Sequence, residues 1–326
     1  MEKNLVCKLV KAMELQKGEV VLLNFWGEDT EIQDLYDFVG AVAAEGAMPM
    51  TLLHTNQYER ELVENMNGEV PEKWMEQFAI VDTVIDIIEK PAGLPPADLS
   101  KEKYPVFGTY LQKLFGAFSK KKKMIQVTMP SDTNAKCVGM EPEAYKERIM
   151  KALDIDYAKM KTDCQAKIDS FTGNVRTIRT GKDCVLTLDT TGREWIADAG
   201  DGALPCGEVY IAPVEEKSNG KVYFETLSVE EVGVFHDVTV TIENGHLISS
   251  TNEEFNAFLK ELPENGGVVA ELGIGMNPNV TGVLGDSVLD ENVIGTFHIA
   301  IGMNHLFGGK NVCPIHYDFV ATGIVE

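Results

Sequence analysis

The chain is poor in cysteine, and no two cysteines have the spacing of a redox or metal-binding pair. Six cysteines are scattered over 326 residues, without any C-x-x-C. That pattern favours reduced thiols in the cytoplasm over a disulfide framework. The stretch MEKNLVCKLVKAMELQKGE carries a charge every few residues and has no apolar centre, so it does not resemble a signal peptide. We therefore expect a cytoplasmic protein.

Long apolar runs and an excess of basic residues are also missing. The longest mostly apolar stretch, residues 38–53, is interrupted by Glu45, which argues against a membrane-spanning helix. Lys and Arg number 29 against 51 Asp and Glu, which gives a net charge of −22. This balance argues against a nucleic-acid surface. We expect a peptide or a small molecule as substrate, and neither nucleic acid nor membrane as partner.

The first half of the chain alternates strand and helix signals. Short, continuous apolar runs are typical of strands buried on both faces. Their alternation with segments of helical spacing predicts an α/β domain with a mostly parallel sheet. No G-x-G-x-x-G follows the first strand, so nothing indicates a dinucleotide cofactor. The strand-like runs are residues 19–26, 48–54, 78–88 and 123–130.

The second half has the sequence pattern of an antiparallel sheet. A long helical region, residues 141–171, precedes it. Turn signals between alternating runs, at residues 218–220 and 243–245, predict β-hairpins, and one helix is expected near residues 252–262. We place the domain boundary near residue 170. The prediction is an α/β domain over residues 1–170 and an antiparallel β-rich (α+β) metal-binding domain over residues 171–326.

Carboxylates and histidines lie in apolar, strand-like runs of this second domain. A buried carboxylate must be paired, protonated or metal-bound. His316 and Asp318 are two residues apart, which places both on the same face of a strand. Each residue taken singly is more often structural, but mixed His and carboxylate sets suit Zn²⁺, Mn²⁺, Co²⁺ or Fe²⁺. The candidate metal ligands are Glu208, Glu271, His298, His316 and Asp318.

Four segments carry a resemblance to a known family. They are GREWIADAG…LPCGEVYIAPVEEKSNG, AELGIGMNP, DENVIGTFHIAIG and IHYD, in this order from Thr191 to the end. Together they resemble the thermophilic metallopeptidase family of the aminopeptidase T and aminopeptidase S type. The resemblance implies a homodimer that removes N-terminal residues from peptides through a water activated by two divalent metal ions. It also implies that the five candidate ligands hold these ions, with Zn, Co or Mn as the metal.

Two further residues are predicted to be catalytic from the resemblance. Glu291, in DEN, would be a further ligand or a carboxylate beside the metals. The family has a tyrosine seven residues after the histidine of the third segment, where this chain has His305. A tyrosine beside two metals can polarise a carbonyl. His305 is therefore predicted either to act on the substrate, as donor, base or extra ligand, or to be an ordinary turn residue.

Two alternatives to a peptidase stay open at this stage. The C-terminal half also resembles iron-dependent dioxygenases that open dihydroxypyridine rings. These need one Fe²⁺ on a face made of two histidines and one carboxylate. His316, Asp318 and one of the other histidines can supply it. A non-catalytic binding protein with a vestigial site is the other alternative. Because Glu208 and Glu271 argue for two metal positions, we expect the peptidase.

Overall fold

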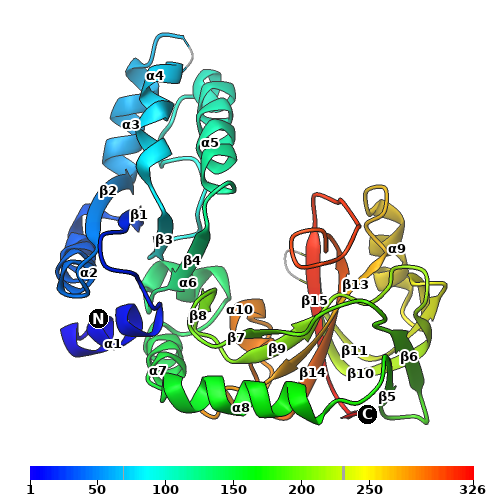
Figure 1. Ribbon diagram of the computed structural model, residues 1–326. Helices are drawn as coiled ribbons and strands as arrows, with labels where there is room; N and C mark the ends of the chain where they lie inside the picture. Colours follow the sequence, from blue (N-terminus) through cyan, green and yellow to red (C-terminus); the bar gives the residue numbers. More distant parts are fainter. Residues whose placement is uncertain (69, 230–231) are drawn as a thin grey trace. The chain divides into compact units, whose positions relative to one another are not determined.

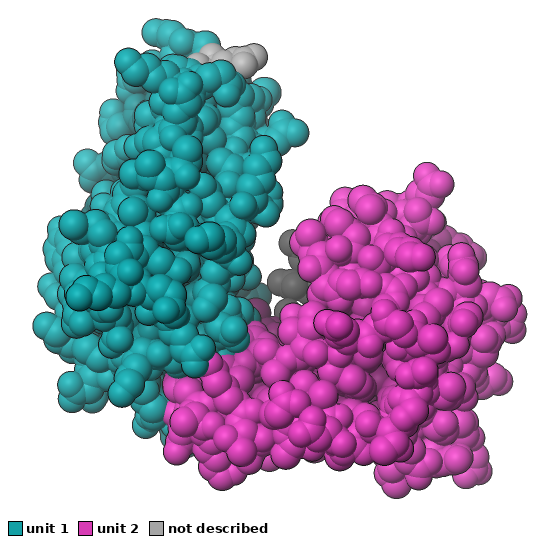
Figure 2. All heavy atoms as spheres, in the orientation of Figure 1, with its two compact units in different colours: residues 1–154, 200–205 teal, residues 155–199, 206–326 magenta. Residues whose placement is uncertain are grey.

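The computed structural model describes residues 1–68, 70–229 and 232–326 (Figure 1). The chain divides into two compact units (Figure 2). Unit 1 comprises Met1–Asp154 and Gly200–Pro205, and unit 2 comprises Ile155–Ala199 and Cys206–Glu326. No helix in the described part of the chain combines the length and apolar character that a membrane span requires.

The division between the units differs from the predicted boundary near residue 170. The predicted helical region of residues 141–171 is two helices, α7 (Pro142–Leu153) and α8 (Tyr157–Ser170). The Asp156 side chain caps α8 by accepting a hydrogen bond from the backbone N–H of Lys159 at 3.0 Å. Helix α8 contacts strands β7 (Ile196–Asp198) and β9 (Glu208–Ile211), so it belongs to unit 2.

Unit 1 is the predicted α/β domain. All four strand pairings of its five-stranded sheet are parallel, in the order β2-β1-β3-β4-β8. The third strand begins later than predicted, because residues 76–80 form a 3₁₀ helix and the Asp82 carboxylate accepts a hydrogen bond from the N–H of Val20. The strands are β1 (Val20–Gly27), β2 (Met48–Thr55), β3 (Thr83–Ile88), β4 (Lys123–Thr128) and β8 (Ala203–Leu204).

Helices connect the strands of unit 1, as the alternating sequence pattern predicts. The longer ones bury one apolar stripe, as in α5, where Phe107, Tyr110, Leu114 and Phe118 are buried. The helices are α1 (Lys3–Ala12), η1 (Asp29–Glu31), α2 (Ile32–Ala44), α3 (Asn56–Asn65), α4 (Glu72–Met75), η2 (Glu76–Ile80), η3 (Lys101–Lys103), α5 (Tyr104–Phe118), α6 (Asp132–Cys137) and α7.

Unit 2 is the predicted antiparallel β-rich domain and contains two sheets. The six-stranded sheet has the order β12-β11-β10-β6-β5-β16, and the five-stranded sheet has the order β15-β14-β13-β9-β7. Rings from both sheets and from one helix, Phe224, Phe319 and Phe255, meet in the core. The remaining elements are β5 (Val175–Arg179), β6 (Val185–Asp189), β10 (Asn219–Val229), β11 (Gly233–Glu243), β12 (His246–Ser250), α9 (Glu253–Glu261), β13 (Val269–Gly275), α10 (Ser287–Asp290), β14 (Thr296–Gly302), β15 (His316–Thr322) and β16 (Ile324–Val325).

One of the two predicted hairpins forms and the other does not. Strands β11 and β12 pair across the turn at residues 243–245, and helix α9 follows where it was predicted. Residues 218–220 form no hairpin turn, because β10 already begins at Asn219, and the chain turns earlier, where the N–H of Lys217 donates to the carbonyl oxygen of Val214. This segment leads from β9 in the five-stranded sheet to β10 in the six-stranded sheet. A turn signal marks where the chain reverses, but the partner of each strand depends on which sheet its apolar face can join.

Candidate metal centre

The five predicted ligands lie on four neighbouring strands of the five-stranded sheet: β9, β13, β14 and β15. In the strand register, Glu208 lies opposite Gly275, and His298 lies opposite Gly273. Ala300 of β14 lies opposite both Glu271 and Asp318. Because directly paired residues point to the same side of a sheet, these side chains share one face. We call this the metal face; the opposite face packs residues such as Phe297 and Phe319 into the core.

The donor atoms form two groups that share Glu271. In the first group, Nε2 of His298 lies 3.1 Å from Oε1 of Glu271 and 3.3 Å from Oε2 of Glu208. In the second group, Nε2 of His316 lies 3.6 Å from Oε2 of Glu271 and 3.4 Å from Oδ1 of Asp318. The two oxygens of Glu271 therefore face different groups. Each group could hold one metal ion.

The spacing and chemistry of these donors fit divalent transition metals. Ligands about 2.1 Å from an ion in tetrahedral geometry are about 3.4 Å from each other. The donor separations of 3.1–3.6 Å within the two groups match this value. Oε2 of Glu208 and Nδ1 of His298 are buried and have no hydrogen-bond partner among the described residues. A buried carboxylate oxygen without a donor is costly unless a cation satisfies it.

The electrostatics of the site also favour a bound cation. Burial raises the pKa of Glu208 well above its usual value, and the charges of Glu291 and Glu271 raise it further. Burial alone would lower the pKa of His316, but the hydrogen bond and charge of Asp318 and the charge of Glu271 outweigh it and raise the pKa to about 9. Without a metal, His316 is thus held as a cation by its acidic neighbours. The site gathers more carboxyl groups than histidines, and bound cations would stabilise the charged forms of these carboxyl groups.

The ring of His316 is oriented by its surroundings. Its Nδ1 donates to the carbonyl oxygen of Met303 at 2.8 Å, which leaves Nε2 for a metal. Phe307 packs edge-on against the His316 ring, with 5.8 Å between the ring centres, and Tyr210 packs edge-on against Phe307. Tyr210 lies in the GEVYIAP segment that carries the family resemblance, whereas Phe307 lies outside the segments quoted for it.

A glycine explains how His298 reaches the other ligands. The imidazole of His298 lies across strand β13 at Gly273. A Cβ atom at residue 273 would lie 2.0 Å from Cε1 and 2.1 Å from Nε2 of His298. Such a contact is far inside the van der Waals separation of about 3.5 Å. Gly273 therefore leaves the space that His298 occupies between Glu208 and Glu271.

The two residues that were predicted to be catalytic have different settings. Glu291 is half-buried directly after α10; burial raises its pKa, and so do the charges of Asp318 and Glu271. His305 is exposed in the turn after β14, and its Nδ1 lies 3.2 Å from the carbonyl oxygen of Asn311. It is absent from both groups of donors. A catalytic role for His305 stays a prediction.

Comparison with known proteins places the chain in a family. The sequence pattern of the family described as thermophilic metalloprotease (M29) matches residues 8–312. The chain belongs to this family. Its fold is similar to that of wild-type AmpT from Thermus thermophilus, with a TM-score of 0.68 over 99% of this chain and 97% of that chain, at 16% sequence identity. No curated protein sequence matches.

Membership in the M29 family confirms the predicted class of enzyme, a metal-dependent peptidase. The similarity to AmpT confirms the predicted architecture, an α/β unit with a parallel sheet and an antiparallel β-rich unit. The matched residues end at 312. His316 and Asp318 join the site because strand β15 pairs with β14 along the metal face.

A further acidic residue of this M29 chain was missed by the sequence analysis. Asp198 of β7 lies directly opposite Glu208 of β9, so it points to the metal face, and it is buried. Its charge raises the pKa of both Glu208 and Glu291. The available signal was the acid between two alanines in EWIADAG, which is similar to the acid in an apolar run that made Glu271 a candidate ligand.

We expect Asp198→Asn to weaken metal binding by about 10–100-fold, because residues next to metal ligands commonly contribute this much. Metal affinity can be measured by competition with a chelating dye. Asp201→Asn is the matched control, since Asp201 is exposed. Equal affinity for Asp198→Asn and the wild type would show that Asp198 plays no part in the metal site.

Proposed function

We propose that the chain is a two-metal aminopeptidase. One divalent cation would be held by Glu208, Glu271 and His298, and the other by Glu271, His316 and Asp318. The observation that carries the proposal is the position of Glu271, whose Oε1 is near His298 and whose Oε2 is near His316. A carboxylate with one oxygen directed to each group is suited to bridge a pair of ions.

The residues around the proposed ions suggest separate roles in catalysis. When bound, the ions would supply a hydroxide near neutral pH and act as Lewis acids on the scissile carbonyl. Glu271 has both oxygens committed to the donor groups, so Glu291 is the better candidate to carry a proton to the leaving amine. Acidic side chains that hold no metal, such as Asp198, would favour the α-ammonium group of an N-terminal residue.

Metal removal and a ligand variant test this function together. Dialysis against a chelator should abolish hydrolysis of aminoacyl anilides, and Zn²⁺, Mn²⁺ or Co²⁺ should restore it. His316→Ala should lower kcat/KM more than about 100-fold, because it removes a ligand rather than a supporting residue. His246→Ala is the matched control, since His246 is exposed on β12 of the same unit. Circular dichroism should show the same fold for both variants.

Metal analysis after purification without chelator separates this proposal from the alternatives. Two Zn, Mn or Co per chain with hydrolysis of aminoacyl substrates would support the aminopeptidase. One Fe per chain, with oxygen consumption on dihydroxypyridines and no hydrolysis, would replace it with the ring-opening dioxygenase. No cleavage of any aminoacyl or peptide substrate by metal-loaded protein would favour a binding protein.

A further inference from the structure

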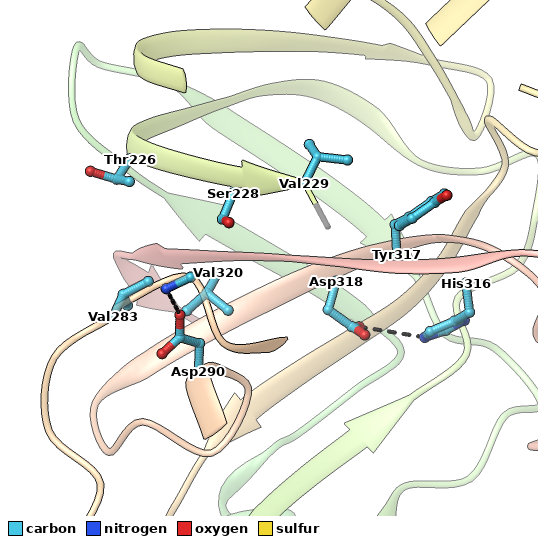
Figure 3. Close-up of a pocket in the computed structure, with 10 residues that line it drawn as sticks. Thr226, Ser228, Val229, Val283, Asp290, His316, Tyr317, Asp318 and Val320 are labelled. Atoms are coloured by element: carbon cyan, nitrogen blue, oxygen red, sulfur yellow. Dashed lines mark hydrogen bonds and ion pairs between the residues drawn. The ribbon is translucent and has the colours of Figure 1, made fainter. Parts of the chain in front are cut away.

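A small cavity adjoins the metal centre at strand β15. Its volume is about 60 Å³. Figure 3 shows that residues from β10, from β15 and from the segment before and within α10 surround it. Two of the proposed metal ligands, His316 and Asp318, form part of its wall. The other lining residues are Thr226, Ser228, Val229, Val283, Gly285, Asp290, Tyr317 and Val320.

The charged groups of the cavity wall are already engaged. The Asp318 carboxylate lies 3.4 Å from Nε2 of His316. Asp290 is buried, and its two oxygens lie 3.0 and 2.9 Å from the backbone N–H of Leu284, which donates to them. The rest of the wall offers valine methyl groups and hydroxyls such as that of Ser228. This lining suits a neutral group, since a buried charge needs a counter-charge.

The size of the cavity restricts the group that can enter. A cavity of about 150 Å³ accommodates benzene. The 60 Å³ cavity is well below that size, so it has room for a few heavy atoms and not for an aromatic ring. Gly285 contributes to this room, because a Cβ atom there would lie 3.2 Å from Oγ of Ser228. The cavity thus fits methyl, hydroxymethyl or isopropyl groups.

We infer that this cavity is the subsite for the side chain of the substrate's N-terminal residue, and that it selects small neutral residues such as Ala, Ser, Thr and Val. The inference rests on the proposed aminopeptidase function. The scissile carbonyl belongs to the substrate's N-terminal residue, and its carbon is bonded directly to the Cα of that residue. When the carbonyl is held at the metals, the side chain on this Cα must therefore lie beside the metal ligands. His316 and Asp318 are those ligands and also line the cavity. In an aminopeptidase no residue precedes this one, so a single small subsite for its side chain is sufficient.

The test compares kcat/KM for a series of aminoacyl anilides with metal-loaded enzyme. Wild type should cleave the Ala and Ser substrates at least about tenfold better than Leu and Phe, since each methylene that does not fit costs about tenfold or more. Ser228→Leu fills the cavity and should lower the Ala-to-Gly ratio of kcat/KM by about tenfold or more. Val283→Ala enlarges the cavity and should raise the Leu-to-Ala ratio. Ser249→Leu, at an exposed position of β12, is the matched control and should keep the wild-type ratios.

The outcomes distinguish this inference from the proposed function. Hydrolysis with the ratios above supports both. Hydrolysis that favours Leu or Phe, or ratios that Ser228→Leu and Val283→Ala leave unchanged, overturns the subsite and leaves the aminopeptidase in place. If no aminoacyl anilide or peptide is cleaved by metal-loaded wild type, the proposed function itself fails, and the subsite fails with it. Thermal unfolding of each variant checks that a changed ratio comes from folded protein.

Discussion

Replacing Glu271 by glutamine is expected to weaken both metal positions at once. The two side chains have nearly the same shape, but an amide nitrogen has no lone pair to offer a cation. Oε1 of Glu271 lies 3.1 Å from Nε2 of His298, and Oε2 lies 3.6 Å from Nε2 of His316. Glu271→Gln should therefore lower kcat/KM more than about 100-fold and reduce the bound metal at both positions. Activity and metal content are measured on the same preparation.

The comparison with single-group variants makes this prediction specific. Asp318→Asn should weaken the second position and leave the first occupied, because Asp318 belongs to the group with His316. Glu254→Gln, at an exposed position of α9, is the control for the same chemical change. The shared role of Glu271 would be refuted if Glu271→Gln lost one ion only, in the same way as Asp318→Asn.

Adding a single methyl group at Gly273 is expected to disable the site without touching any ligand. In Gly273→Ala the new Cβ would lie 2.0 Å from Cε1 of His298, so the imidazole must leave its place beside Glu271. We expect kcat/KM to fall more than about 100-fold, since displacement by about 1 Å already costs this much when geometry is tightly set. Metal content should fall with it. Steady-state kinetics and metal analysis check both effects.

The same substitution six residues earlier provides the control. At Gly267 a Cβ atom would meet no atom closer than 3.5 Å, the carbonyl oxygen of Leu247. Gly267→Ala should therefore keep wild-type kinetics, and it carries the same change in backbone entropy as Gly273→Ala. If Gly273→Ala kept full activity, the ring of His298 would have another position from which to reach the site. If both variants were inactive and melted early, the effect would be one of stability.

Local sequence did not predict the strands of the two halves of the fold equally well. Strands buried on both faces are continuous apolar runs, so β1 and β2 could be located within one residue of their ends. The late start of β3 could not be foreseen, because the hydrogen bond from Val20 to Asp82 joins residues far apart in the chain. Residues 218–220 have the composition of a hairpin turn, but β10 already begins at Asn219, and β9 and β10 lie in different sheets. Turn propensity is local, whereas strand pairing depends on non-local burial.

By itself, the sequence determined which donor atoms are available and in which kind of element they lie. An acid in an apolar run must be satisfied in the interior, and the two side chains of H-x-D on a strand point to the same face. Glu271, His316 and Asp318 could therefore be proposed as metal ligands without a structure. Only the tertiary structure decided that β9, β13, β14 and β15 lie side by side, so that these donors form two groups with Glu271 between them. It also decided the positions of Asp198 and Gly273 and the cavity between β10 and β15. The physical reason is that side-chain alternation is a property of one strand, while register and neighbours come from the burial of a whole sheet, to which residues far apart in the chain contribute.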